Sequence, residues 1–185
     1  MRIISGKYRG YRLKAVPGMG TRPTADKIKG AIFNVLREKV ENARVLDLFS
    51  GTGNLALEAL SRGAKEAILI EKSRTAQDII RFNLEHVGTE QAKLMTMDAF
   101  AYLEHAQEEV FDLIFLDPPY HKGLSEKALH QLAEPCRLSE SGVIVVETAK
   151  DEFVPEIKPF EVRKTGEYGD TKIWYIQRSR MIGVD

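Results

Sequence analysis

The sequence predicts an α/β fold in which a mostly parallel sheet is wound by helices. Short apolar runs without polar alternation, which are typical of strands buried on both faces, recur along the chain. Segments of helical periodicity separate these runs, and strands that alternate with helices at this spacing indicate a doubly wound parallel sheet. The expected strands span residues 44–49, 67–70, 93–97, 111–116 and 143–146.

The segments between the strands are expected to be helical. A further helix is expected before the first strand, from Thr24 as the N-cap to about Glu38, because its apolar residues fall on one face. After the last strand, residues 160–165 and 172–177 surround Gly169 and predict a closing antiparallel hairpin. The other expected helices span residues 55–62, the segment from a Ser73 cap to 86, the stretch after Asp98, and 122–133.

The chain begins with a segment that we expect to be a small β-hairpin. Residues 2–5 and 11–16 are the two expected strands of this hairpin. The sequence Pro-Gly-Met-Gly at 17–20 follows as a flexible joint. We therefore predict two parts, a basic hairpin arm at 1–20 and the main domain at 21–185.

The charge distribution favours a nucleic-acid partner for this arm. Residues 1–30 hold eight basic groups and one acid, a net charge of +7 in a chain whose net charge is zero. Such asymmetry is a footprint of nucleic-acid binding, although basic residues at a terminus can also be merely solvated. Tyr8 and Tyr11 lie among the basic residues, and their rings could stack on unpaired bases.

Length and composition limit the alternatives. A chain of 185 residues is long enough for one α/β domain with a full core. The single cysteine, Cys136, allows no internal disulfide and fits a reducing cytoplasm. No stretch approaches the roughly 20 apolar residues that a membrane-spanning helix needs. We expect a cytoplasmic monomer that has no metal site and does not enter a membrane.

The first expected strand runs directly into a glycine turn at 50–54, and a helix follows. Small residues in such a turn let backbone amides approach a ligand. Acids stand at three successive strand ends, namely Asp47, Glu71 and Asp98. Each could be a helix cap, but the carboxyl ends of parallel strands line one edge of a sheet, where ligands bind. Together they predict a site for an adenosine-containing cofactor, with Glu71 on the ribose hydroxyls and Asp98 on the adenine amino group.

The segment Asp117-Pro118-Pro119-Tyr120 ends the strand at 111–116. Two consecutive prolines stop the strand and stiffen the loop that follows. The acid and a carbonyl can accept hydrogen bonds from an exocyclic amino group while the tyrosine ring stacks on the base that carries it. A plain Pro-Pro turn with an exposed tyrosine is the alternative.

The glycine turn alone does not identify the cofactor. Residues 51–56 also fit the G-x-G-x-x-A fingerprint of a dinucleotide-binding fold. A hydride-transfer enzyme has no use for a clamp on an amino group, whereas an enzyme that methylates an amino group of a base does. The segment at 117–120 therefore favours a methyltransferase over a nicotinamide oxidoreductase.

This Asp-Pro-Pro-Tyr segment resembles that of the S-adenosylmethionine-dependent amino-methyltransferases. Nearly the whole chain is similar to the RsmD family, which methylates the exocyclic amino group N2 of a guanine in small-subunit (16S) ribosomal RNA. The resemblance is carried by the opening hairpin, the Arg22-Pro23-Thr24 and Phe33-Asn34 motifs, the loop at 47–53 with the helix at 57–64, and Tyr168-Gly169-Asp170-Thr171. It implies a Rossmann-like class I methyltransferase sheet with a small N-terminal basic β-hairpin.

The resemblance also implies roles for individual residues. The catalytic set is Asp117, Pro118, Pro119 and Tyr120. The residues implied for S-adenosylmethionine are Asp47, Phe49, Ser50, Gly51, Thr52, Gly53, Asn54, Glu71, Lys72, Asp98 and Ala99. The residues implied for RNA are Arg2, Lys7, Arg9, Arg12 and Arg22.

Some positions depart from the family pattern, and other functions stay open. Thr52 and Asn54 stand where Ser and a smaller residue are usual, which a loop that works through its backbone tolerates. His121 follows Tyr120, and we expect a solvated loop histidine there rather than a contact with the target. The alternatives are a methyltransferase of DNA amino groups, a protein-glutamine methyltransferase, and a non-catalytic RNA-binding or ribosome assembly factor with this fold.

Overall fold

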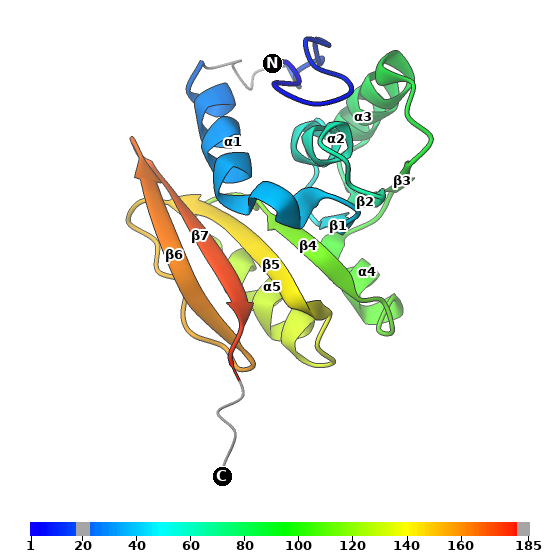
Figure 1. The fold of residues 1–185 in the computed structure, drawn as a ribbon. Coiled ribbons are helices and arrows are strands. Elements are labelled where there is room, and N and C mark those ends of the chain that lie inside the picture. The colour runs from blue at the N-terminus through cyan, green and yellow to red at the C-terminus, as the bar shows by residue number, and fades with distance from the viewer. Residues whose placement is uncertain (18–22, 181–185) are drawn as a thin grey trace.

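The computed structural model describes residues 1–17 and 23–180 and confirms the α/β prediction. A seven-stranded sheet has the order β3-β2-β1-β4-β5-β7-β6 (Figure 1). The first five strands are parallel, and β6 and β7 form an antiparallel hairpin at one edge. The strands are β1 (Arg44–Asp47), β2 (Glu66–Ile70), β3 (Ala92–Met95), β4 (Phe111–Leu116), β5 (Leu138–Ala149), β6 (Phe160–Tyr168) and β7 (Thr171–Arg178).

Helices cover both faces of the sheet (Figure 1). They are α1 (Pro23–Leu36), the short 3₁₀ helix η1 (Arg37–Val40), α2 (Asn54–Ser61), α3 (Arg74–Val87), α4 (Ala99–His105) and α5 (Leu124–Ala133). Helices α1, α2 and α3 pack their apolar residues on one face, against Val45, Leu113 and Phe115. Helices α4 and α5 pack on the other face, against Leu46 and Ile114. Successive residues of these strands face the two cores in turn, so both faces of the strands are buried. This explains why the strands appear in the sequence as continuous apolar runs.

Several expected boundaries were wrong. Helix α1 already includes Pro23, so Thr24 lies within the helix and is not its N-cap. Proline is well suited to the first turn of a helix, because the amide hydrogen that it lacks would have no partner there. Strand β5 extends beyond 143–146 at both ends, because it pairs with β7 as far as Ala149 and with β4 back to Leu138. The predicted Ser73 cap is confirmed by its acceptance of a hydrogen bond from the Ala76 amide.

The N-terminal arm, residues 1–17, is less regular than the predicted hairpin. Its two halves form a single isolated bridge between Arg2 and Arg12, in place of two paired strands. The amides of Ile3 and Leu13 still bond across the arm, to the carbonyls of Tyr11 and Met1. Apolar side chains of the arm then pack on α2 and α3. The buried residues of this small core are Ile3, Tyr8, Leu13, Leu57 and Val87.

Backbone contacts fix the arm on the end of α2. The amide of Lys7 bonds the Ser61 carbonyl at 2.8 Å, and the Tyr8 amide bonds the Ser61 hydroxyl at 2.9 Å. Gly6, with φ +89°, lies so close that a Cβ there would stand 1.9 Å from the Ser61 carbonyl oxygen. Only glycine allows this approach. The turn of the expected hairpin is therefore also the place where the arm contacts the end of α2.

A buried ion pair lies beneath the arm. Lys29 of α1 is 1% exposed and Glu58 of α2 is fully buried, with 3.0 Å between Nζ and Oε1. Glu58 also accepts hydrogen bonds from the amides of Ile4 (2.8 Å) and Ser5 (3.1 Å). The Lys29 ammonium donates to the carbonyl of Arg2 in the arm, at 2.6 Å. Helices α1 and α2 and the arm are therefore joined by one buried polar network.

Two further predictions concern the chain as a whole. Residues 18–22 lie outside the described residues, so the proposed division into an arm at 1–20 and a domain at 21–185 stays a prediction. The part of that arm at 1–17 packs on the main body. Among the described residues, no helix has the length and apolar character to cross a membrane.

Candidate active site

The carboxyl ends of β1 and β4 lie side by side at the point where the strand order reverses. Asp47, the last residue of β1, is in register with Phe115 of β4. Asp117 comes two residues after Phe115, directly after the end of β4, and so lies just beyond the level of Asp47. Open α/β sheets bind their ligands at this switch point.

Asp47 is a buried acid with one unused oxygen. The residue is 1% exposed, and its Oδ2 accepts a hydrogen bond from the Ser50 hydroxyl at 3.1 Å. Its Oδ1 is buried and has no hydrogen-bond partner among the described residues. Burial, with a contribution from the charge of Glu71, raises the pKa of Asp47 to about 7. A ligand that brings a cationic or polar donor would satisfy this oxygen.

The glycine turn forms an open loop between β1 and α2. Gly51 and Gly53 have φ values of +60° and +80°, which side chains of L residues rarely adopt. A Cβ at Gly51 would meet nothing within 4 Å, whereas one at Gly53 would lie 3.3 Å from Leu69. The backbone at Gly51 therefore stays accessible to a ligand, and Gly53 lets α2 begin close to the sheet.

The other two strand-end acids already have backbone partners. Glu71 accepts from the Gly51 amide at 2.8 Å and, through its second oxygen, from the Ser73 amide at 2.9 Å. Asp98 caps α4, because its Oδ1 accepts from the amides of Phe100 (2.9 Å) and Ala101 (3.2 Å). The helix-cap alternative is thus correct for Asp98. Both acids still line the cleft described below, and their roles toward a cofactor stay predictions.

The tyrosine of the loop after β4 is held by contacts with two strands. The Tyr120 hydroxyl donates to Glu147 Oε1 of β5 at 3.0 Å and lies 3.3 Å from Thr171 Oγ1 of β7. Pro118 is buried, whereas Asp117 and Pro119 are exposed. The ring of Tyr120 is more than one third exposed, so it remains available for stacking.

Acids gather around Asp117. Desolvation of its carboxyl group and the charges of Glu147 and Asp47 raise the pKa of Asp117 well above its ordinary value. Desolvation also raises the pKa of Glu147. Although the residue as a whole is exposed, desolvation of its carboxyl group makes the largest contribution to this shift, and the two neighbouring acids add to it. The two groups Asp117 and Glu147 titrate as a pair that holds a proton to higher pH than a solvated acid does.

These elements surround one cleft of about 800 Å³. Ten residues of the predicted cofactor and catalytic sites line this cleft. They are Phe49, Gly51, Glu71, Lys72, Asp98, Ala99, Asp117, Pro118, Pro119 and Tyr120. A hollow of about 260 Å³ continues it toward α1 and adds Asp47, Ser50, Thr52 and Asn54. The predicted cofactor and catalytic residues, apart from the buried Gly53, thus line two adjoining hollows that share Phe49, Gly51 and Asp117.

Several lining residues were absent from the sequence-based site. Glu147 lines both hollows and is the most informative omission. It directly follows the expected strand at 143–146, which is the same signal that singled out the other acids. Val16 of the arm also lines both hollows, and Lys29 lines the smaller one. Neither position shows a sequence signal, because each reaches the cleft only through the packing of the arm and α1.

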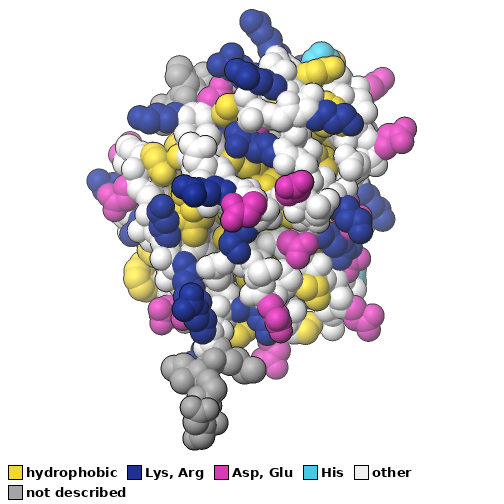
Figure 2. All heavy atoms as spheres, viewed as in Figure 1, with side chains coloured by type: hydrophobic (Ala, Val, Ile, Leu, Met, Phe, Trp, Pro, Cys, Tyr) yellow, Lys and Arg dark blue, Asp and Glu magenta, His cyan; other side chains and the backbone are white. Residues whose placement is uncertain are grey.

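The residues predicted to bind RNA lie on the surface of the arm. Arg2, Lys7, Arg9 and Arg12 are exposed, and Lys and Arg side chains gather over the arm at the top of the view (Figure 2). Arg22 lies outside the described residues.

The two arm tyrosines differ from one another. Tyr11 is 41% exposed, but Tyr8 is 8% exposed and belongs to the small core beneath the arm. The expectation that both rings could stack on bases was therefore wrong for Tyr8.

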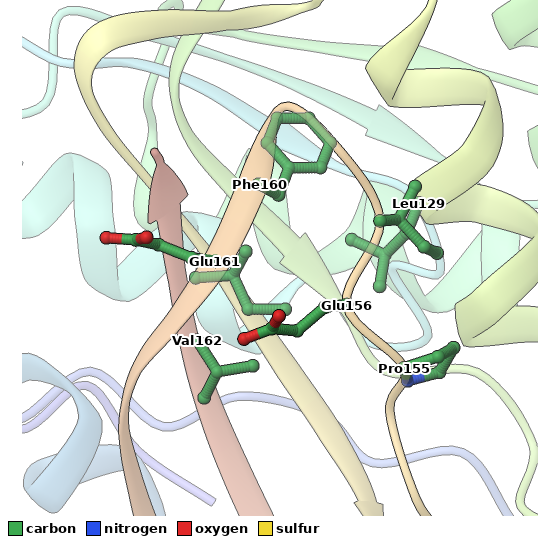
Figure 3. A pocket seen from close by; sticks show the side chains of 8 residues that line it. Leu129, Pro155, Glu156, Phe160, Glu161 and Val162 are labelled. Carbon is green, nitrogen blue, oxygen red and sulfur yellow. The ribbon is translucent and has the colours of Figure 1, made fainter. Parts of the chain in front are cut away.

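Two other features lie apart from the cleft. His121 is exposed, and its ring pairs with Asp151 at 2.8 Å, a contact that raises the pKa of His121. This agrees with the expected solvated loop histidine. A hollow beside α5 and β6, among Leu129, Glu156 and Phe160, has a volume of about 10 Å³ (Figure 3). It has room for about one water molecule and carries no candidate chemistry.

Comparisons with known proteins match almost the whole chain. The family model described as "Conserved hypothetical protein 95" matches residues 1–177. "Ribosomal RNA small subunit methyltransferase D" of Haemophilus influenzae is 38% identical over 162 residues, which cover 86% of this chain and 83% of that protein. The protein of the same name from Escherichia coli K12 is 34% identical, over 85% of this chain and 79% of that protein.

A solved structure agrees with these relatives in fold. The protein yhhF of Escherichia coli superposes with a TM-score of 0.84 and is 34% identical. The match covers 96% of this chain and 97% of yhhF. The match to the family model and the two sequence relatives extend the resemblance seen in the motifs to most of the chain. The chain belongs to the family of Conserved hypothetical protein 95, the RsmD family.

Proposed function

We propose that the protein transfers a methyl group from S-adenosylmethionine to the amino group N2 of a guanine in 16S ribosomal RNA. The observation that carries this proposal is the single cleft in which the glycine turn and the Asp117–Tyr120 segment meet. The names of the relatives support an enzyme that methylates small-subunit ribosomal RNA. The chemistry of the segment at 117–120 suits an exocyclic amino group, and the choice of guanine N2 is what the resemblance to the RsmD family implies.

The residues around the glycine turn fit S-adenosylmethionine. This molecule offers an ammonium group, ribose hydroxyls and an exocyclic amino group, all of which donate hydrogen bonds. The unused Oδ1 of Asp47, beside the open backbone at Gly51, suits one such donor. We assign Glu71 to the ribose and Asp98 to the adenine amino group, both as acceptors. Bound S-adenosylmethionine would supply the methyl group in an electrophilic form.

The Asp117–Tyr120 segment would hold the target base. Asp117 and the carbonyl of Pro118 accept hydrogen bonds from the guanine amino group and orient its lone pair toward the methyl donor. Tyr120 stacks on a base that has left its helix, and Pro119 keeps the loop stiff. The amino nitrogen would lose a proton after it takes the methyl group, so no strong base is needed, and we assign its uptake to the acids that line the cleft, Asp117 and Glu147.

The N-terminal arm would supply most of the affinity for RNA. Its exposed cations Arg2, Lys7, Arg9 and Arg12, with Arg22, would contact phosphates, which gives affinity with little sequence choice. We further propose that the protein acts as a monomer in the cytoplasm, on the small ribosomal subunit or its precursor.

The test is transfer of labelled methyl from S-adenosylmethionine to small ribosomal subunits that lack the modification. DNA and free protein serve as alternative acceptors, and digestion identifies the labelled nucleoside. We expect the label in the RNA, as guanine methylated on N2. Label in DNA or protein alone would contradict the proposal. Absence of label despite cofactor binding, measured by calorimetry, would favour an assembly factor instead.

A further inference from the structure

An aromatic patch joins the N-terminal arm to the far end of α3. The Tyr11 ring lies edge-on to His86, with 5.6 Å between ring centroids. Phe82 and His86 stack with their planes 13° apart and their centroids 5.9 Å apart. Residues four apart on a helix share a face, so Phe82 and His86 present adjacent rings. We define the aromatic patch as Tyr11, Phe82 and His86.

This patch is open to solvent. Phe82 is 49% exposed and Tyr11 is 41% exposed, and His86 is also exposed. The patch is separate from the face of α3 that packs in the core, where Ile79 and Ile80 are buried. Exposed large apolar side chains that lie together often mark an interaction site. The rings therefore contribute little to the core and stand where a partner can reach them.

A cation lies over one of the rings, and the neighbouring arm is basic. The Lys14 ammonium lies 5.0 Å from the centroid of Phe82, and residues 1–17 contain five basic residues and no acid. In the space-filling view, Lys and Arg side chains gather over the arm with hydrophobic side chains between them (Figure 2). Rings interleaved with cations are the usual composition of a surface that binds single-stranded nucleic acid, because bases stack on the rings while phosphates meet the cations.

The patch is also placed to work with the cleft. Ala76 of α3 lines the cleft, and His86 lies ten residues further along the helix, a distance of about 15 Å at the usual rise. Along the arm, Tyr11 belongs to the patch and Val16 lines the cleft. A strand of RNA could thus place one base in the cleft while neighbouring unpaired bases reach the patch.

We propose that Tyr11, Phe82 and His86 form a stacking platform for unpaired bases of the RNA substrate. The proposal rests on the proposed function for the identity of the polymer, and it adds α3 to the RNA-binding surface. It also assigns a role to Phe82 and His86, which the sequence motifs did not select. The platform contacts bases and the arm cations contact phosphates, so the two sets have separable effects on affinity and on its salt dependence.

The test measures binding of a short single-stranded RNA of mixed sequence and of the matched RNA duplex, by fluorescence anisotropy over a range of salt. The variant is Phe82→Ala with His86→Ala. We expect its affinity for the single strand to fall about tenfold or more, because each stacked base contributes substantially to binding. The salt dependence should be unchanged, because the variant removes no phosphate contact. Duplex binding should change less, since paired bases are not free to stack.

Two control variants sharpen the result. Val110→Ala removes an exposed apolar side chain just before β4, on a segment that belongs to neither the arm nor α3, and should leave both affinities unchanged. Lys7→Gln with Lys14→Gln should weaken binding of both RNAs and reduce the salt dependence. Circular dichroism and cofactor binding should match the unchanged protein in all three variants.

Equal affinity of the Phe82 and His86 variant for the single strand would overturn the proposal. So would a loss seen only with assembled ribosomal subunits and not with RNA alone, because the patch would then dock a protein. The outcome is independent of the methylation assay. A chain that uses the patch to bind RNA but transfers no methyl group would contradict the proposed function and leave the platform intact.

Discussion

The hydroxyl of Tyr120 donates a hydrogen bond to Glu147 Oε1 at 3.0 Å and thereby ties the loop after β4 to the end of β5. Thr171 of β7 lies 3.3 Å from the same hydroxyl. The hydroxyl contacts therefore fix the orientation of the ring that we assign to base stacking, while the exposed part of the ring remains free. Stacking requires a defined ring plane, and this contact provides it.

Tyr120→Phe keeps the ring but loses both hydroxyl contacts. We expect methyl transfer to fall about fivefold to tenfold, which corresponds to the roughly 1 to 1.5 kcal/mol that one hydrogen bond contributes. Tyr120→Ala should cost more, because it removes the ring as well. Steady-state transfer rates on small subunits measure both effects. Equal rates for the phenylalanine variant and the unchanged protein would show that the hydroxyl contacts do not position the ring.

Asp117→Ala removes the proposed acceptor for the target amino group. We expect methyl transfer to fall by more than about a hundredfold, the scale seen when one oriented polar group is removed from an active site. Binding of S-adenosylmethionine, measured by calorimetry, should change little, because the cofactor residues lie around the glycine turn. Retained activity would exclude Asp117 from the reaction.

The acids near Asp117 predict a specific pH dependence. Desolvation, Glu147 and Asp47 raise the pKa of Asp117, so the acceptor form is lost as pH falls through a midpoint well above that of a solvated aspartate. Transfer rates should therefore rise with pH through this midpoint. Glu147→Gln removes one neighbouring charge and should move the midpoint to lower pH.

A matched variant distinguishes this effect from a general change in charge. Asp151 is an exposed acid that pairs with His121, and it does not contribute to the shifted pKa of Asp117. Asp151→Asn should leave the midpoint of the rate profile where it is. If both variants move the midpoint equally, the local carboxyl pair does not set the pH dependence.

Gly6 and Gly10 form a matched pair in the arm, because both have a φ of +89°. A Cβ at Gly6 would lie 1.9 Å from the Ser61 carbonyl oxygen, whereas one at Gly10 would meet nothing within 4 Å. We expect Gly6→Ala to cost on the order of 2 to 3 kcal/mol of unfolding free energy, and Gly10→Ala about 1 kcal/mol from backbone strain alone. Denaturant unfolding measures both. Equal costs would mean that the arm does not press on α2.

Glu58 tests the buried ion pair. Glu58→Gln leaves the Lys29 ammonium buried without its counter-charge and should cost about 3 to 5 kcal/mol. Glu66→Gln is the surface control, because Glu66 pairs with Arg44 at 2.6 Å but both side chains are partly exposed. Such pairs contribute about 0 to 1 kcal/mol. A small effect at Glu58 would show that water or a rearrangement compensates the charge.

Much of the sheet could be predicted from the sequence, because a strand that is buried on both faces consists of consecutive apolar residues. The run at 111–116 gave the bounds of β4, and the acids that follow such runs gave the edge where the cleft lies. Strand β5 was underestimated, because its polar residues Ser139 and Glu140 lie between Leu138 and Val143, which pair with β4 across an irregularity that the local sequence does not show.

Contacts between distant segments could not be predicted. Lys29 and Glu58 look like ordinary charges on helix faces, since their burial depends on how α1, α2 and the arm pack. The burial of Tyr8 has the same origin. Glu147 is different, because its position after an expected strand was visible, but its contact with Tyr120 depends on how close the loop after β4 lies to β5.

The network under the arm has a practical consequence for experiments on truncated chains. Deleting residues 1–17 would take two amide donors from the buried carboxylate of Glu58 and the Arg2 carbonyl from Lys29. It would also uncover Leu57 and Val87. Loss of activity in such a truncation would report damage to the catalytic body as much as loss of RNA contacts. Single changes at exposed arginines keep the scaffold whole and isolate the contribution of the arm.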